Sequence, residues 1–413
     1  MLRGKLRSFL NDSFLSIAGL VIMNVAAQFA VYPAWNQYLG AEINGEILYL
    51  ISILNIYAIS IGSACNYARM TREAVRKQDN SDYNLYMVIA TAVAVALTPV
   101  VPYLTSMPMD GLDVTLFALL CILTMWRFYA DVEYRMSLNY RGCFCYYLII
   151  GVGYLAGIAL FRLTGRWAMA LIPGEAAGIA LVLLRGKVLR GGMKPTGEFR
   201  SALSLMTMLA GTNILSNLIF NGDRLLLNVM VDGVAVTIYY LASLLGKTMS
   251  LITTPLNSVI MGYLARYDGG LDRKLMHIIT GISAAACVLA TIACTVASHI
   301  LIPWLYPTEY ALAKEYFITA NLAQVLFFIG NVITVVLLRF SKARYQLYIN
   351  LVYAAAFLLI CPVAAYLYGI NGFCWGLMVT CTLRLGYSLL LGYKAAGHQP
   401  ECDMEHTHKE QKE

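Results

Sequence analysis

Residues 239–256 read YYLASLLGKTMSLITTPL, and Lys247 lies near the middle of them. The longer run 237–265 is apolar enough to cross a lipid bilayer, since a helix spans the hydrocarbon core with about 20 mostly apolar residues. A lysine at that depth is costly unless it faces water, protein or an anion. The stretch therefore predicts a membrane-spanning helix with a polar environment around Lys247.

The whole chain has the composition of a membrane protein. Of its 413 residues, 59% are hydrophobic and 13% are charged, and the mean hydropathy is +0.66. Charged residues make up about 25% of an ordinary soluble domain. Twelve apolar segments are long enough to cross a bilayer as helices, at 13–32, 47–65, 85–104, 112–129, 143–163, 167–184, 203–221, 237–262, 277–298, 316–338, 346–366 and 372–392. The sequence therefore predicts an all-α polytopic membrane protein with about twelve transmembrane helices.

Basic residues are distributed unequally between the two sides that these segments define. Of the 30 Lys and Arg residues, 24 lie in the connections of one side, with Arg127 at the end of the fourth segment counted among them, whereas the other side has Arg162, Arg166, Arg224 and Lys314. Short loops rich in Lys and Arg remain in the cytoplasm. We therefore predict that both termini are cytoplasmic, and we attribute the net charge of +7 to topology, with no nucleic-acid partner.

The most basic connection follows the sixth predicted span. It reads RGKVLRGGMKPTGEFR (185–200) and contains four glycines and a proline, as linkers often do. With six spans on either side of it, the chain is expected to form parallel repeats, a common transporter plan. We predict an N-terminal six-helix lobe at 1–184, a basic cytoplasmic linker at 185–202, a C-terminal six-helix lobe at 203–392 and a polar cytoplasmic tail at 393–413.

Motifs of catalysis are missing from the sequence. It contains no P-loop, no GxSxG, no HExxH and no dinucleotide fingerprint. The ten cysteines include neither a CxxC pair nor a zinc-type spacing, and most lie within predicted spans, where cysteine packs as a small apolar residue. We therefore expect no catalytic residue, no cofactor and no metal, and a protein that moves a substrate rather than converting it.

Polar residues recur at helical spacing on four of the predicted spans. They are Tyr240, Ser243, Lys247, Ser250 and Thr254 on the eighth, Asn213 and Asn217 on the seventh, Asn24 and Gln28 on the first, and Asn55 on the second. A polar stripe on a spanning helix should face the bundle interior or water, because lipid offers it no partner. These residues, together with Arg384 on the last span, are the candidates to line a substrate cavity. The alternative is structural: amides that join helices, an acidic partner for Lys247 and snorkelling for Arg384.

One carboxylate lies within a span. Glu175 follows Pro173 and Gly174 in the sixth span, and a buried acid there would be protonated or paired. It is a candidate ion-coupling residue, and the alternative is a structural acid beside a Pro-Gly break. An exporter of small cations should have several carboxylates in its cavity, whereas the charges at mid-span here are mainly Lys247 and Arg384. An anionic substrate is therefore preferred.

The segment 220–266, FNGDRLLLNVMVDGVAVTIYYLASLLGKTMSLITTPLNSVIMGYLAR, resembles the second-half signature of the oligosaccharide flippases. These polysaccharide biosynthesis proteins belong to the multidrug/oligosaccharidyl-lipid/polysaccharide exporter superfamily. The residues similar to the signature are Asp223, Tyr239 and Pro255, whereas Thr237 stands where the family usually has glycine. Further similarity lies in VYPAWNQYLGAEINGEILYL (31–50), EYRMSLNYRGCFCYYLIIGVGYLAGIALF (133–161) and YLYGINGFCWGLMVTCTLRLGYSLLL (366–391).

The resemblance implies two six-helix lobes around a central cavity that opens alternately to each side. The substrate would be a polyprenyl-pyrophosphate-linked oligosaccharide repeat unit, flipped across the bacterial inner membrane for O-antigen, capsule or exopolysaccharide assembly. Membrane lipid, a polysaccharide polymerase and glycosyltransferases would be its partners. The alternatives are a cation-coupled small-molecule or multidrug exporter of the same superfamily and, less expected, a polyprenyl-linked glycan polymerase. A polymerase should carry a large outer loop with catalytic residues, whereas the longest outer connections predicted here are short.

Overall fold

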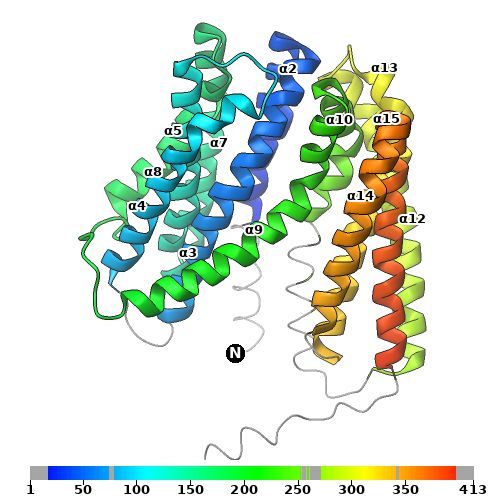
Figure 1. Cartoon of the computed structure of the whole chain (residues 1–413). Coiled ribbons are helices and arrows are strands. Elements are labelled where there is room, and N and C mark those ends of the chain that lie inside the picture. Colours follow the sequence, from blue (N-terminus) through cyan, green and yellow to red (C-terminus); the bar gives the residue numbers. More distant parts are fainter. Residues whose placement is uncertain are drawn as a thin grey trace, which may run out of the picture. The chain divides into compact units, whose positions relative to one another are not determined.

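The computed structural model describes residues 17–73, 79–251, 253, 257, 260, 271–340 and 344–396. Every regular element among these residues is a helix, and no strand occurs in them (Figure 1). The predicted all-α class is therefore confirmed. Thr254 and the predicted tail beyond residue 396 lie outside the described residues.

Eight helical stretches of the described residues are long and apolar enough to cross a membrane. Two of them, Ile17–Glu73 and Tyr345–Ala395, contain 57 and 51 residues, which is more than one crossing requires. Each is interrupted by a glycine with positive φ, at Gly40 (85°) and Gly369 (59°), so each supplies two crossings. The two halves of Tyr345–Ala395 run side by side in Figure 1, drawn in orange and red. The sixth and eighth predicted spans correspond to α8 (Ile172–Arg185) and α10 (Gly233–Thr248), which accounts for all twelve.

The chain divides into two compact units, Met1–Thr237 and Ile238–Glu413. Unit 1 contains α2 (Tyr32–Leu54), α3 (Ser60–Glu73), α4 (Asn80–Leu97), α5 (Gly111–Ala130), α6 (Val132–Met136), α7 (Tyr140–Thr164), α8 and α9 (Phe199–Met230), with the short helices η1 (Ala27–Val31), η2 (Asn55–Ile59), η3 (Thr98–Tyr103) and η4 (Trp167–Ala170). Unit 2 contains α12 (Arg273–Leu305), α13 (Tyr310–Ala313), η5 (Lys314–Tyr316), α14 (Phe317–Phe340) and α15 (Arg344–Ala395). The boundary between the units falls within α10.

Several helices begin at side chains that cap them. Asp79, Asp110, Asn139 and Asp272 accept hydrogen bonds from backbone N–H groups in the first turns of α4, α5, α7 and α12, over 2.7 to 2.9 Å. Such caps satisfy N–H groups that have no partner inside the helix. They explain why the long apolar runs start where they do.

Glycines bring helices of unit 1 into backbone contact. A Cβ added to Gly153 of α7 would lie 2.4 Å from the Cα of Gly174 in α8, and one added to Gly157 would lie 2.2 Å from the carbonyl oxygen of Ala170. Small residues allow such close approach of membrane helices. This packing places Glu175, the residue after Gly174, inside the unit.

The basic connection after the sixth span is held against unit 1. The Lys187 and Val188 N–H groups donate to the Glu133 carboxylate, each over 2.8 Å, and the Thr196 hydroxyl donates to Asp82 over 2.6 Å. Asn80 donates to the Lys187 carbonyl over 2.7 Å. The next helix, α9, then packs along α3 and α2, so α9 belongs to unit 1. The lobe boundaries expected from the sequence stay a prediction.

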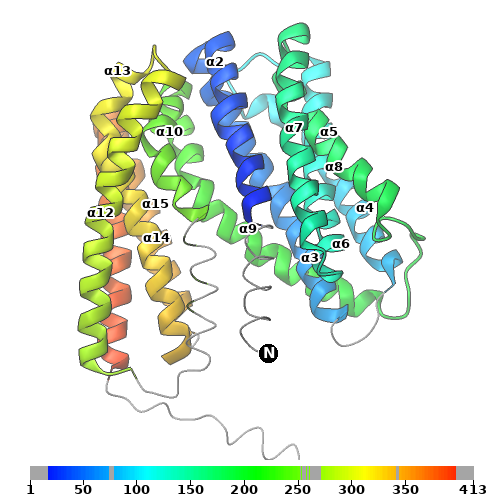
Figure 2. The same ribbon diagram turned by 180° about the vertical axis from the view of Figure 1, so that it is seen from behind.

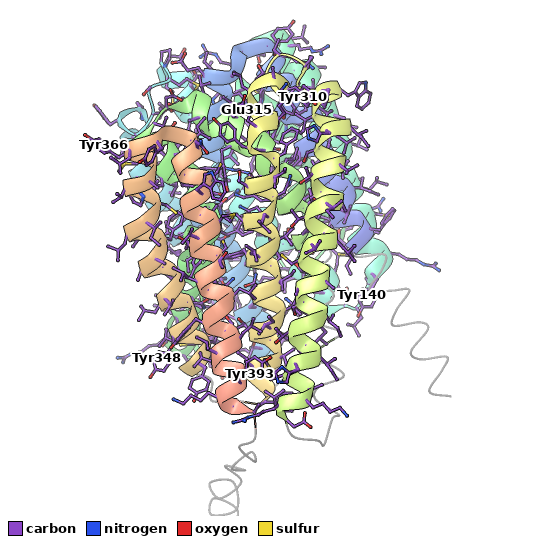
Figure 3. The ribbon with its side chains drawn as sticks, turned by 90° about the vertical axis from the view of Figure 1, so that its right-hand side faces the viewer. Tyr140, Tyr310, Glu315, Tyr348, Tyr366 and Tyr393 are labelled. Atoms are coloured by element: carbon purple, nitrogen blue, oxygen red, sulfur yellow. The ribbon has the colours of Figure 1, made fainter. Side chains whose placement is uncertain are left out.

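In unit 2, α14 packs against both α12 and α15 (Figure 2). Tyrosines lie at both ends of the unit: Figure 3 shows Tyr310 and Tyr366 toward one end and Tyr348 and Tyr393 toward the other. Tyr366 is 81% exposed. Tyrosine is enriched where membrane helices meet the headgroup region. The distribution fits helices that cross a bilayer from one tyrosine level to the other.

Candidate functional site

The candidate residues of the seventh span contact the second. Asn213 donates to the backbone carbonyl of Ser60 over 3.2 Å, and Asn217 donates to the Ser60 hydroxyl over 3.0 Å. Both amides therefore join α9 to α3, which is the structural role weighed for them above. Neither side chain is fully buried.

The candidates of the first two spans lie in or near irregular helical turns. Gln28 belongs to the π-helical turn η1, and Asn55 begins the π-helical turn η2. Asn24 donates to the carbonyl of Leu20, one turn earlier, over 2.8 Å. All three side chains are partly buried. Single π turns are rare and are frequent at functional sites, so Gln28 and Asn55 keep their place as candidates.

The candidates on α10 are enclosed by protein. Tyr240 and Ser243 are 1% and 0% exposed, and Lys247 is 9% exposed. Ser250 is partly buried. On the opposite face of α10, Leu241 is 0% exposed, whereas Leu245 is only partly buried. The part of the stripe formed by Tyr240, Ser243 and Lys247 is thus buried in the conformation described here.

A chain of hydrogen bonds joins α10 to α14 and α12 within unit 2. The Gly246 N–H, directly before Lys247, donates to the Asn321 side chain over 2.7 Å, and Asn321 donates to the Ser298 hydroxyl over 3.1 Å. Gln324 donates to the Tyr239 hydroxyl over 2.9 Å. These hydrogen bonds place polar groups of α10, α12 and α14 in the part of unit 2 that contains Lys247.

Arg384 lies between α14 and α15. Its guanidinium donates to the Phe327 carbonyl over 3.0 Å and to the Asn331 side-chain oxygen over 2.6 Å. Its charged group also lies 4.5 Å from the ring centroid of Phe327 and 5.5 Å from that of Tyr353, within the range of cation–π attraction. Arg384 is 4% exposed, so its observed contacts are those of a helix-joining residue.

Glu175 is paired. One carboxylate oxygen accepts from the Arg127 guanidinium, and the other accepts from the Tyr154 hydroxyl over 2.5 Å. The side chains of Arg127 and Glu175 are 5% and 3% exposed. The three residues come from α5, α7 and α8, and the Tyr146 hydroxyl further fixes α5 by donating to the Arg127 carbonyl over 2.9 Å. The geometry matches the structural alternative for Glu175.

Sequence reasoning missed several of these partners. Arg127 was counted with the basic loops, yet it is buried inside α5 as the partner of Glu175. Asn321 and Gln324 on α14 and the acid Glu46 on α2 were not singled out, although each is a polar residue inside or beside an apolar run. A polar residue in an apolar run can be recognised in the sequence, but the run does not indicate which helix the side chain contacts.

The fold can now be compared with known proteins. No protein-family model matches the chain, and no curated protein matches it. Among solved structures, an inward-facing multidrug resistance MATE family transporter of the MOP superfamily is similar, with a TM-score of 0.69 and 13% identity over 92% of this chain and 97% of that one.

Two further structures show the same fold. Lipid II flippase MurJ, in an inward closed conformation, has a TM-score of 0.68 and 12% identity, covering 92% of this chain and 87% of that one. A MOP superfamily transporter from Pyrococcus furiosus, which has a binding pocket of reverse polarity, is similar with a TM-score of 0.60 and 14% identity over 92% of this chain and 93% of that one. The chain is a multi-pass membrane protein with the fold of MOP superfamily transporters and flippases.

Proposed function

We propose that this protein is a flippase that moves polyprenyl-pyrophosphate-linked oligosaccharides across the bacterial inner membrane by alternating access. The MOP fold supports transport in general, because the similar structures include both multidrug transporters and a lipid II flippase. The glycan and pyrophosphate of such a substrate need a polar path, while its polyprenyl tail can remain in lipid. The substrate is thus amphipathic and anionic.

The observation that carries the proposal is the charge of the second half. The predicted spans from the eighth to the twelfth contain no Asp or Glu, and they contain two cations, Lys247 and Arg384. A transporter of cationic drugs would need carboxylates along its substrate path, whereas a pyrophosphate needs cations. We assign Lys247 to the pyrophosphate, because it shares the polar stripe of the eighth predicted span with Tyr240 and Ser243.

A second candidate function is cation-coupled export of small molecules, which the similarity to multidrug transporters favours. It would require a carboxylate that binds and releases a cation. Glu175 meets this requirement less well than a free acid would, because Arg127 and Tyr154 occupy both of its oxygens. The flippase proposal ranks first on the charge of the second half, whose predicted spans from the eighth to the twelfth contain Lys247 and Arg384 and no Asp or Glu.

The proposal also includes the orientation of the protein in the membrane and the enzymes that act before and after it. Both termini would lie in the cytoplasm, and glycosyltransferases would build the substrate on that side. A polysaccharide polymerase would use the flipped product on the outer side. These partners follow from the chemistry of the proposed substrate: a lipid-linked glycan built on one face of the membrane and used on the other must cross it between the two reactions.

The test is flipping by the purified protein in proteoliposomes. A fluorescent polyprenyl-pyrophosphate oligosaccharide is placed in both leaflets, and a membrane-impermeant reductant then bleaches the outer one. With the protein present, fluorescence should fall beyond the outer-leaflet fraction, and protein-free vesicles should not show this second loss. A fluorescent phosphatidylcholine serves as the matched lipid without a glycan. Extrusion of a cationic dye under a cation gradient, with no flipping of the glycolipid, would replace the proposal by the exporter.

A further inference from the structure

Glu46 lies where three connections of unit 1 meet. It belongs to α2, six residues after the break at Gly40, and it is 4% exposed. The distribution of basic residues predicts that Gly40, the connection 104–110 and the connection between α9 and α10 are extracytoplasmic. Glu46 is therefore a buried acid at the predicted outer end of the second span.

One oxygen of Glu46 accepts hydrogen bonds from three donors on two other elements. The Thr105 hydroxyl donates to Oε2 over 2.6 Å, the Ser106 N–H over 3.3 Å and the Asn228 side-chain amide over 3.4 Å. Thr105 and Ser106 belong to the connection before α5, and Asn228 belongs to α9. Glu46 thus ties the outer end of α2 to both of them.

All three donors are neutral. None of the ion pairs found in the described residues includes Glu46. Tyr49 follows Glu46 by about one turn of α2. The other charged groups on the elements around it are Glu42 on α2, Asp110 with its partner Arg166, Asp223 and Arg224 on α9, and Asp232, which accepts from the Ala235 N–H. A carboxylate held by neutral donors can take up a proton without leaving a buried cation unpaired, unlike Glu175.

The start of α10 closes against the same part of α2. A Cβ added to Gly45 would lie 1.7 Å from the carbonyl oxygen of Gly233, so the two backbones are in direct contact. The Thr237 hydroxyl donates to the Ala41 carbonyl over 2.6 Å and accepts from Asn44 over 3.2 Å. The residue that departs from the family signature therefore fastens α10 to α2, next to Glu46.

We propose that Glu46 is a proton-binding site that controls separation of α2 from α9 and α10 at the outer end. With the carboxylate ionised, its hydrogen bonds are charge-assisted and hold these elements together, as in the structure described here. Protonation removes the charge, weakens the three bonds and favours separation. By linkage, separation favours proton binding to the same extent. The proposal rests on the proposed transport function only in assigning this separation a role in transport.

The experiment measures disulfide formation between cysteines placed at Asn44 and Thr237, in a background without the native cysteines. At pH 7.5, Glu46→Gln should lower the rate of cross-linking by roughly three- to tenfold, because a neutral side chain weakens the charge-assisted bonds. At a pH acid enough to protonate Glu46 in the parent, the rates of the parent and the Gln variant should converge. The comparison is made at equal pH, so the pH dependence of thiol chemistry cancels.

Glu42→Gln is the matched control, since Glu42 is exposed and lies one turn away on the same helix. It should leave the rate unchanged at both pH values. Asn228→Ala, which removes one donor, should produce a smaller loss than Glu46→Gln at pH 7.5. Equal rates for the parent and a normally folded Glu46→Gln variant at pH 7.5 would overturn the proposal. Cross-linking needs no substrate, so the result stands apart from the success or failure of the flipping assay.

Discussion

Arg127 and Glu175 form an ion pair inside unit 1, with both side chains almost fully buried. Removing one member of a buried pair leaves the other charge uncompensated, which costs about 3–5 kcal/mol. Glu175→Gln should therefore lower the melting temperature of the detergent-purified protein markedly. The double variant Arg127→Met/Glu175→Gln should recover much of the loss. A Glu175→Gln variant that keeps its stability but no longer transports would instead identify Glu175 as an ion-coupling residue.

Arg384 should prove structural in the same kind of measurement. Lysine keeps the charge but cannot reach both the Phe327 carbonyl and Asn331, as the guanidinium does. We expect Arg384→Lys to destabilise the protein by about 2 kcal/mol, because at least one of the two acceptors loses its charged donor. Asn331→Ala should cost less, since the bond to Phe327 remains. Normal stability of Arg384→Lys combined with lost flipping would move Arg384 to the substrate path.

Asp110 and Arg166 provide a test of pH dependence outside the membrane spans. The hydrogen bond from Arg166 lowers the pKa of the Asp110 carboxyl from its usual 3.8. A carboxyl whose pKa is lowered in the folded state stabilises the protein fully at pH values above its usual pKa of 3.8. This contribution to stability disappears as the pH falls through the lowered pKa. Asn caps a helix about as well as Asp, so Asp110→Asn removes the charge and keeps the cap of α5. The small difference in melting temperature between the two proteins should be present at pH 7 and vanish in acid.

Reporter fusions test the orientation that places Glu46 outside. A fusion after Arg190 should report the cytoplasm, and fusions near Gly40, Asp110 and Thr308 should report the outer side, because the basic connections determine orientation. An inverted pattern would exchange the cytoplasmic and outer sides, and Glu46 would then lie at the cytoplasmic end of its helix. The hydrogen bonds of the 187–196 connection to α4 and α6 would then lie on the outer side.

The helical architecture was predictable because each span carries its own signal. Apolar length is a local property, and it predicted the twelve segments and the helical class, whereas the orientation predicted from the basic residues stays a prediction. The break at Gly369 was indicated by the gap between the predicted spans 346–366 and 372–392. The ordered conformation of the linker could not be predicted from its glycines. It depends on hydrogen bonds to the acceptors Asp82 and Glu133, which lie far away in the sequence.

The candidate site was predictable only in part. Helical spacing identifies which residues share a face, as for Asn213 and Asn217, but it does not identify the partner helix. Glu46 meets Asn228 across 182 positions of sequence, and Arg384 meets Asn331 across 53. Such pairs depend on how helices are shifted against one another, which a single sequence does not specify. The same limitation hid the pairing of Arg127 with Glu175.

The assignment of Lys247 to an anionic substrate is the central claim of the proposed function. Lysine offers a compact ammonium suited to phosphate or an acidic sugar. Lys247→Arg should keep part of the activity because the charge persists in a different geometry. Lys247→Glu should be at least as damaging as Lys247→Ala, since a carboxylate repels an anion. Asn321→Ala, which alters the neighbouring hydrogen bond to the Gly246 N–H, is the control for indirect effects on α10.

The most direct test is surface polysaccharide restored by Lys247→Ala in a flippase-deleted strain, divided by the amount of the protein in the membrane. We predict that the variant inserts normally, because removing the side chain leaves α10 and its apolar contacts in place, and that it restores little polysaccharide while the unchanged protein restores it fully. Full restoration by normally inserted Lys247→Ala would contradict the assignment of Lys247 to the substrate.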